Sequence, residues 1–278
     1  MEVIVAKTAG FCFGVKRAVE KVYANVDKEH VYTYGPIIHN EQVVADLEKH
    51  GVRVVEEDTD LTLLPEGTIV VRAHGASRAE FDRLRECGMQ IEDATCPFVS
   101  KIYRIVEEES KAGRTVIIVG NAAHPEVRGI RGWSGEDTYV VGSIEEANNL
   151  NILAKNISIV SQTTFNLKKF KEIVEIFEKK GYDIKCLNTI CNATEVRQTE
   201  ARQIASQVDA MIVIGGKNSS NTQKLFEICK EECSNTYYIQ TAEDLDYTAI
   251  RGMQRIGITA GASTPKNIIE EVQTRCQI

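Results

Sequence analysis

Three cysteines and three glycines recur at matched intervals along this chain. The cysteines lie 84 and 95 residues apart, at Cys12, Cys96 and Cys191. The glycines lie 85 and 95 residues apart, at Gly35, Gly120 and Gly215. Each glycine ends a short apolar run, and each cysteine stands before an amphipathic, helix-like stretch. Matched intervals of this length are typical of an internal repeat, so the chain is predicted to contain three similar units of roughly 90 residues.

Apolar runs alternate with amphipathic stretches in every unit, which predicts an α/β fold with mostly parallel sheets covered by helices. The third unit lacks a last strand after its helical stretch PKNIIEEVQTRC, and the N-terminal run VIVAKTAGFC is expected to supply it. The predicted units are therefore 13–96, 97–191, and 192–278 completed by 1–12. A pseudo-threefold arrangement of these units would bring the three cysteines to one central site.

Composition excludes several classes of protein. A net charge of −7 and a pI of about 5.4 argue against a nucleic-acid-binding surface, which would be basic. No stretch approaches the roughly 20 apolar residues of a membrane span, and the N-terminus lacks the pattern of a signal peptide. Without a secretion signal, eight cysteines indicate thiols or metal ligands rather than disulfides. A cytoplasmic protein with no membrane or nucleic-acid partner is expected.

The three repeated cysteines predict a metal centre. A cysteine between a strand and a helix lies near unpaired amide donors and the positive end of the helix dipole, which favours the metal-binding thiolate. Three thiolates leave one position open, either on an iron of a [4Fe–4S] cluster or on a zinc ion, although catalytic zinc usually has mixed ligands. An iron–sulfur cluster is favoured. The other five cysteines are expected to be ordinary thiols, namely Cys87, Cys186, Cys229, Cys233 and Cys276.

Polar residues recur at the same offsets from the repeated glycines. Four residues after each glycine come His39, His124 and Ser219, and six residues after come Glu41, Glu126 and Asn221. A second set of loops is expected to be equivalent: Ala73–Gly75 with His74, Gln162–Thr164, and Gly261–Ser263. Loops at the carboxyl ends of parallel strands are where such folds bind ligands. With the glycine- and hydroxyl-rich segment Gly215–Asn221 at a helix start, these donors could bind a diphosphate.

Glu126 is the carboxylate of this set with an evident chemical use. A protonated glutamate in a closed pocket could deliver protons to a leaving hydroxyl or to a reduced carbon. It could equally be a favourable charge in the first turn of a helix. The sequence leaves both interpretations open.

Eight short motifs together resemble the 4-hydroxy-3-methylbut-2-enyl diphosphate reductase family, in family order from residue 10 to residue 265. They are Gly10–Val15 (GFCFGV), Ala73–Gly75 (AHG), Ala94–Pro97 (ATCP), Gly120–Glu126 (GNAAHPE), Ser161–Thr164 (SQTT), Cys191–Thr194 (CNAT), Gly216–Asn221 (GKNSSN) and Thr259–Ser263 (TAGAS). The resemblance implies three α/β units around one [4Fe–4S] cluster and the last reaction of the non-mevalonate isoprenoid pathway.

The resemblance also implies a role for each site residue. Cys12, Cys96 and Cys191 would be the cluster ligands, Glu126 the proton source, and Thr163 a contact to the substrate alcohol that helps to relay protons. The diphosphate would be bound by His39, His74, His124, Ser219, Ser220, Asn221 and Ser263. No nucleotide or flavin motif is evident, so electrons are expected from a separate ferredoxin or flavodoxin.

Two other functions fit the same residues. A redox-neutral dehydratase could use the same open iron without consuming reductant. A non-catalytic module that binds a phosphorylated ligand or senses iron could use the cysteines without turnover.

Overall fold

A computed structural model describes residues 1–277, whose strands form three four-stranded parallel sheets. The chain divides into two compact units. The middle unit, Arg17–Ile37 and Leu47–Cys191, contains two of the sheets, and the terminal unit, Met1–Lys16, Ile38–Asp46 and Asn192–Ile278, contains the third. Helices α1 (Phe13–Tyr23) and α2 (Glu41–Lys49) contribute residues to both units. The three-unit boundaries expected from the sequence stay a prediction.

The first sheet has the strand order β3-β2-β4-β5. Its strands are β2 (Val31–Tyr34), β3 (Arg53–Val55), β4 (Thr68–Val71) and β5 (Gln90–Asp93), with the short helix η1 (Leu61–Leu63) between β3 and β4. Alternate residues of β2 and β4, such as Tyr32 and Ile69, pack against Leu84 of α3 (Arg78–Glu86). Ser77 and Glu80 form a capping box that fixes where α3 begins.

The second sheet repeats this order as β7-β6-β8-β9. Its strands are β6 (Thr115–Val119), β7 (Thr138–Val141), β8 (Asn156–Ser161) and β9 (Asp183–Cys186). Side chains of β6 alternate between two cores: Ile118 packs with α4 (Pro97–Lys111) and α5 (Pro125–Trp133). Ile117 packs with the other core, to which α6 (Ile144–Asn149) and α7 (Leu167–Lys179) contribute. Both faces are covered, which explains the continuous apolar run of β6.

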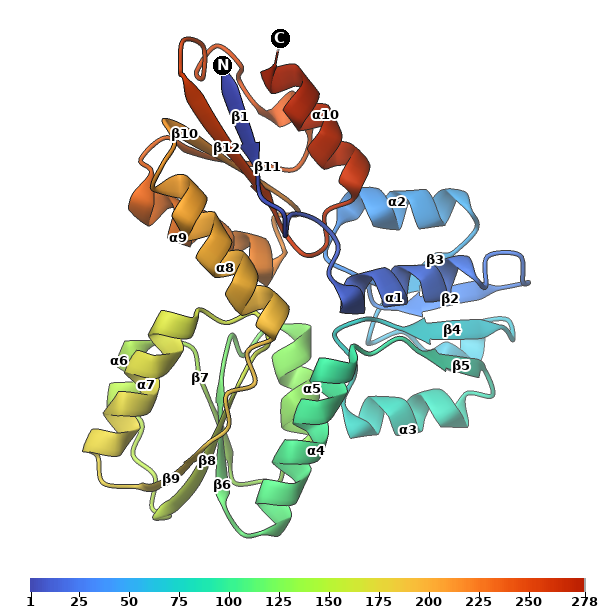
Figure 1. The fold of residues 1–278 in the computed structure, drawn as a ribbon. Helices are drawn as coiled ribbons and strands as arrows, with labels where there is room; N and C mark the ends of the chain where they lie inside the picture. Colours follow the sequence, from blue (N-terminus) through green and yellow to red (C-terminus); the bar gives the residue numbers. More distant parts are fainter. Residues whose placement is uncertain (278) are drawn as a thin grey trace. The chain divides into compact units, whose positions relative to one another are not determined.

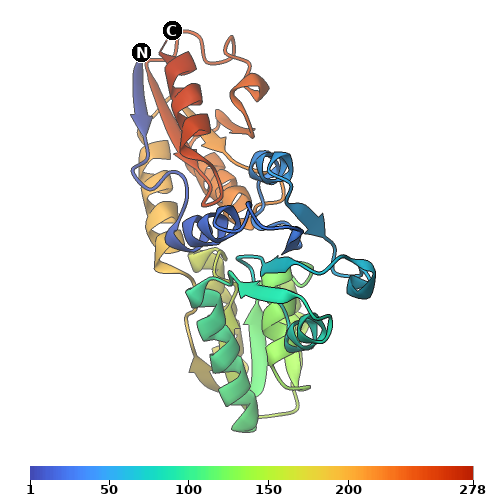
Figure 2. The same ribbon diagram turned by 90° about the vertical axis from the view of Figure 1, so that its right-hand side faces the viewer.

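The third sheet has the order β11-β10-β12-β1, so the N-terminal strand closes it as predicted. Its strands are β1 (Glu2–Val5), β10 (Ala210–Ile214), β11 (Thr236–Ile239) and β12 (Arg255–Ala260), with η2 (Ala242–Asp244) after β11. Met211 and Val213 pack toward α8 (Asn192–Ala205) and α9 (Ser220–Glu232), whereas Ile212 packs toward α10 (Lys266–Cys276). Figures 1 and 2 show β1 beside β12 at the edge of this sheet.

The three sheets share one strand order, which confirms the predicted α/β fold and its repeat. In each sheet one inner strand (β2, β6 or β10) is followed directly by one of the repeated glycines. The amide of that glycine donates to the carbonyl of the last residue of the neighbouring edge strand: Gly35 to Val55, Gly120 to Val141, and Gly215 to Ile239. Within residues 1–277, none of the helices combines the length and apolar character needed to cross a membrane.

Closure of the third sheet by β1 should be testable through Val5, whose side chain packs on the terminal-unit core. Val5→Asp should lower the free energy of unfolding by about 2 kcal/mol, because a charge would be placed against apolar side chains. Glu2→Gln is the control, since the exposed Glu2–Arg255 ion pair contributes little. Urea unfolding measures both variants, and equal midpoints would contradict the packing of Val5.

Candidate functional site

Each of the three repeated cysteines is fixed through its backbone amide. Cys96 donates to the carbonyl of Ala73 (2.9 Å), Cys191 to that of Thr163 (3.0 Å), and Cys12 to that of Ala262 (3.2 Å). Every acceptor lies two residues beyond the third strand in the order of its own sheet, which is β4, β8 or β12. The repeat therefore extends to the hydrogen bond that orients each cysteine. Convergence of all three thiols at one site stays a prediction.

The loops that supply these carbonyls correct one equivalence drawn from the sequence. Each contains a turn in which the fourth residue donates to the first: Gly75 to Arg72, Phe165 to Gln162, and Thr264 to Gly261. Structurally, Gln162–Thr164 and Gly261–Ser263 therefore match Arg72–His74, not Ala73–Gly75. The predicted register was wrong by one residue, because the apolar run Thr68–Val71 does not reveal in sequence alone where the strand pairing stops and the turn at Arg72 begins.

The helix caps correct a second equivalence. His124 caps α5 by accepting from the amide of Glu126 (3.1 Å), and Ser219 caps α9 by accepting from Thr222 (3.3 Å). Asn40, not His39, is the corresponding cap of α2, since its side chain accepts from the amide of Val43 (3.1 Å). The loop after Gly35 is one residue longer than its two counterparts, so His39, although four residues after its glycine, is not the structural equivalent of His124 and Ser219.

Glu126 and Thr163 form a buried pair within the middle unit. The Thr163 amide donates to Oε1 of Glu126 (2.6 Å), and the Thr163 hydroxyl donates to Oε2 (2.8 Å). Glu126 is only 2% exposed. Burial raises the pKa of Glu126 to about 7, even though both hydrogen bonds from Thr163 favour the charged form. A carboxyl group that titrates near neutrality can both hold and release a proton under working conditions.

His74 and His124 lie edge to face in the same unit, with ring centroids 5.3 Å apart. Because Nδ1 of His124 accepts the Glu126 amide hydrogen, a neutral His124 must carry its proton on Nε2. That nitrogen is then a hydrogen-bond donor, which suits an anionic ligand. The structure thus brings together four predicted site residues of the middle unit in two pairs: His74 with His124, and Glu126 with Thr163.

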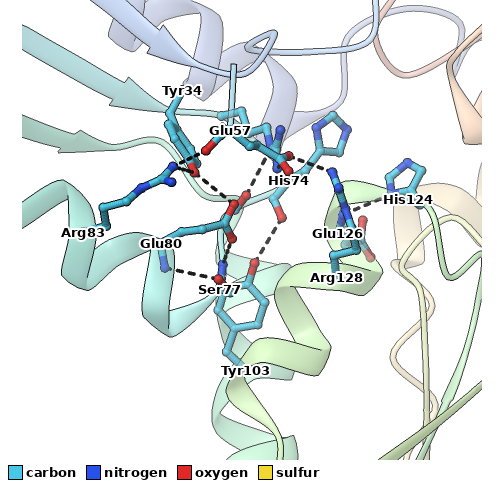
Figure 3. Close-up of polar contacts among 12 residues, drawn as sticks. Tyr34, Glu57, His74, Ser77, Glu80, Arg83, Tyr103, His124, Glu126 and Arg128 are labelled. Carbon is cyan, nitrogen blue, oxygen red and sulfur yellow. Dashed lines mark hydrogen bonds and ion pairs between the residues drawn. The ribbon is translucent and has the colours of Figure 1, made fainter. Parts of the chain in front are cut away.

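Tyr103 of α4 fixes the loop that carries His74 (Figure 3). Its hydroxyl donates to the His74 carbonyl (3.1 Å), and its ring stacks on Trp133 at 5.4 Å. Gly75 has φ +74°, and a Cβ there would lie 2.1 Å from the Tyr103 hydroxyl, so only glycine fits. Trp133 in turn donates to the carbonyl of Ala76 (2.9 Å). Two aromatic side chains therefore hold the strand-end loop in place.

In the terminal unit, polar donors gather where α9 begins. Ser219 and Asn221 are each 5% exposed, and Asn221 Nδ2 has no hydrogen-bond partner among residues 1–277. The Ser263 hydroxyl donates to the carbonyl of His39 (3.1 Å). A Cβ on Gly216 would lie 2.6 Å from that same carbonyl oxygen, so a glycine lets the two loops approach. Ser220, the first residue of α9, is half-buried. The predicted residues of this unit thus surround a helix N-terminus, which favours anions.

Comparison with known proteins identifies the family. The LytB protein family matches residues 3–277. The chain belongs to the LytB protein family. It is 48% identical over 275 residues to the 4-hydroxy-3-methylbut-2-enyl diphosphate reductase of Caldanaerobacter subterraneus subsp. tengcongensis, covering 98% of this chain and 95% of that protein. It is 47% identical over 278 residues to the reductase of the same name from Geobacter sulfurreducens, covering 100% and 97%.

Two solved structures of such reductases share the LytB fold seen here. The E-1-hydroxy-2-methyl-but-2-enyl-4-diphosphate reductase of Plasmodium falciparum matches with a TM-score of 0.93 and 29% identity, over 99% of this chain and 87% of that one. A structure of (E)-4-hydroxy-3-methyl-but-2-enyl diphosphate reductase, described as the terminal enzyme of the non-mevalonate pathway, matches with a TM-score of 0.70 and 42% identity, over 100% and 99%.

Sequence reasoning missed residues that support the site rather than form it. Tyr103 and Arg197 occur inside helices, where the sequence shows only a buried helix face. Arg197 is 3% exposed and donates to the carbonyls of Ala260 (2.6 Å) and Gly10 (2.9 Å). Neither residue belongs to a repeated motif, so nothing in the sequence distinguishes it from a core position.

The raised pKa of Glu126 predicts a specific dependence of stability on pH. Stability linked to Glu126 is fully present below the ordinary glutamate pKa of about 4.3 and is lost as the pH rises to about 7, the value in the folded protein. Relative to Glu126→Gln, the wild type should lose roughly 4 kcal/mol over this range. Urea unfolding at several pH values measures the difference. Glu145→Gln changes an exposed residue on α6 and should show the same pH dependence of unfolding free energy as the wild type. If the unfolding free energies of Glu126→Gln and the wild type changed in parallel with pH, the burial of a titrating carboxyl group would be contradicted.

Removing the Tyr103 hydroxyl should loosen the His74 loop. Tyr103→Phe loses the hydrogen bond to the His74 carbonyl and should lower the free energy of unfolding by about 1 kcal/mol. Amide exchange at Gly75 should become faster, as measured by hydrogen exchange. Tyr139→Phe, at a tyrosine 38% exposed on β7, serves as control. Unchanged exchange at Gly75 would show that Tyr103 does not hold the loop.

Proposed function

We propose that this chain is a 4-hydroxy-3-methylbut-2-enyl diphosphate reductase, the last enzyme of the non-mevalonate isoprenoid pathway. The reaction breaks the bond between C4 and its hydroxyl oxygen, consumes two electrons and two protons, and releases water. The products are isopentenyl diphosphate and dimethylallyl diphosphate. Family membership over residues 3–277 supports the assignment, and the buried Glu126–Thr163 pair is the observation that carries its chemistry.

Cys12, Cys96 and Cys191 are proposed to ligate one [4Fe–4S] cluster. All three are half-buried cysteines that form no disulfide within residues 1–277, and their amides are fixed in the same way by three equivalent carbonyls. Soft thiolate ligands suit an iron–sulfur cluster, so the donor set fits the group that the family implies. When bound on three cysteines, such a cluster supplies electrons one at a time and one iron with an open position for a substrate oxygen.

The diphosphate is proposed to bind polar residues at strand-end loops and at the start of α9. Ser219 and Asn221 occupy the start of α9, where backbone amides and the helix dipole favour an anion, and the Asn221 amide group still has a donor to offer. His124 presents a donor at Nε2 for the reason given above. The complete proposed set is His39, His74, His124, Ser219, Ser220, Asn221 and Ser263.

Glu126 is proposed to supply protons, and Thr163 to pass them on. With a pKa of about 7, Glu126 is protonated in a large fraction of molecules at neutral pH, although an exposed glutamate would be ionised. The Thr163 hydroxyl lies 2.8 Å from Oε2 of Glu126 and can both accept and donate a proton. Thr163 can therefore connect the carboxyl group to the oxygen that leaves as water.

Electrons are proposed to come from a separate ferredoxin or flavodoxin, since the sequence lacks an evident nucleotide or flavin motif. A cytoplasmic location is proposed as well, because none of the eight cysteines, all within residues 1–277, forms a disulfide, a state favoured by a reducing compartment.

The decisive experiment is reductant-dependent turnover after anaerobic reconstitution with iron and sulfide. Wild-type enzyme should consume two electrons for each hydroxymethylbutenyl diphosphate converted. Glu126→Gln should reduce kcat by at least about 100-fold while retaining its iron, because the amide cannot donate an acidic proton. Wild-type kcat should fall as the pH rises above about 7, where Glu126 ionises.

The exposed Glu145→Gln variant on α6 is the matched control and should keep wild-type turnover. Product formation without consumption of reductant would overturn the reductase assignment in favour of redox-neutral dehydration. Full activity of Glu126→Gln would overturn the role of Glu126 alone.

A further inference from the structure

We infer that Arg17 and Arg197 are positioning residues that hold the backbone segments leading into Cys96 and Cys12. Each arginine lies on the helix that follows a different one of the three cysteines: Arg17 on α1, after Cys12, and Arg197 on α8, after Cys191. This inference rests on the proposed function for its link to the cluster, whereas the contacts themselves are independent of it.

In the terminal unit, α8 holds the segment before Cys12 by two side chains. The buried Arg197 guanidinium donates to the carbonyl of Gly10, two residues before Cys12 (2.9 Å), and to that of Ala260 at the end of β12 (2.6 Å). One turn further along α8, Glu200 accepts from the amides of Lys7 and Thr8 (2.9 Å each). The long loop between β1 and Cys12 is thus fixed to the helix at both ends.

In the middle unit, α1 holds the segment before Cys96 in the same manner. Arg17 donates to the carbonyl of Thr95, directly before Cys96 (3.0 Å). One turn further along α1, Lys21 donates to the carbonyl of Asp93 (3.1 Å) and forms an ion pair with Glu92 (2.7 Å). Each of the two helices therefore holds its segment by two side chains. An arginine binds a carbonyl close to the cysteine, and a second charged residue binds the backbone at or just after the preceding strand.

The segment before Cys191 is held differently. Here the helix that follows Cys96 is α4, and its contacts with β9 and the residues beyond are the Glu109–Lys185 ion pair and the packing of Leu187 on the α4 core. Neither contact lies within three residues of Cys191. The loops of Cys12 and Cys96 thus share a guanidinium at a carbonyl within two residues of the proposed ligand.

An arginine is suited to this position for two reasons. Its guanidinium presents several donors in a fixed plane and stays charged when buried, so it can bind two carbonyls at once. Mutation of residues that orient metal ligands typically lowers metal affinity about 10- to 100-fold. Losing either arginine should free one cysteine segment while leaving the rest of the fold intact.

The test uses the anaerobically reconstituted full chain, exposed to an iron chelator and sampled with short pulses of iodoacetamide. Arg197→Met should release iron about tenfold faster than wild type, with the extra alkylation appearing first at Cys12. Arg17→Met should do the same with Cys96 labelled first. Arg197→Lys, which keeps the charge and one donor, should restore part of the retention. Mass spectrometry reads each cysteine separately, and the fully buried Cys229 reports global unfolding.

Lys16→Met on α1 and Arg202→Met on α8 are the controls: Lys16 is exposed, and Arg202 is partly exposed and pairs with Glu231 and Glu232 rather than with a cysteine segment. Wild-type release rates in both arginine variants would overturn the inference, as would labelling that rises equally at Cys229. A wild-type chain that takes up no iron would refute the proposed cluster instead. Pulse labelling of that iron-free chain would still decide whether Arg197 protects Cys12 and Arg17 protects Cys96.

Discussion

A single backbone hydrogen bond, repeated three times, is the contact on which the arrangement of the cysteines depends. In each sheet the carbonyl two residues beyond the third strand accepts the amide of a cysteine that starts the next helix. The bond links a strand end, a turn and a helix start, so a change in any of the three would move the thiol. Because strand pairing fixes the position of the carbonyl, the sheets determine the cysteine backbone before any metal is present.

Burial of polar groups at the strand ends is the second constraint. Glu126 is enclosed with Thr163, and the desolvation that raises its pKa is opposed by two donors from one residue. Without those donors a buried carboxyl group would be protonated over a wider pH range; with more donors it would remain ionised. The pair thus sets a balance near neutrality, where a group can transfer protons in either direction.

Much of the fold could be predicted from the sequence, because repetition carries information that single motifs lack, whereas the roles of the site residues stay predictions. The closing role of β1 followed from the repeat alone, since the third unit lacked one strand. The errors were of one residue: Thr163 was matched to His74, and His39, rather than Asn40, was matched to His124 and Ser219. Sequence periodicity locates an apolar run but not the last paired residue of a strand or the length of the turn that follows. Tyr103, Arg17 and Arg197 could not be found, since their roles depend on carbonyls far away in the chain.

Closure of the third sheet by its N-terminal strand has a consequence for the order of synthesis. Strand β1 leaves the ribosome long before its partner β12, because the paired residues Glu2 and Arg255 are 253 positions apart. At roughly 5–20 residues per second, β1 waits on the order of ten seconds or more for that partner. The loop of Cys12, which binds Ala262 and Arg197, waits with it. The two sheets of the middle unit can form before β12 is made, whereas Cys12 reaches its final backbone position only after β12 and the loop at Ala262 have been synthesised.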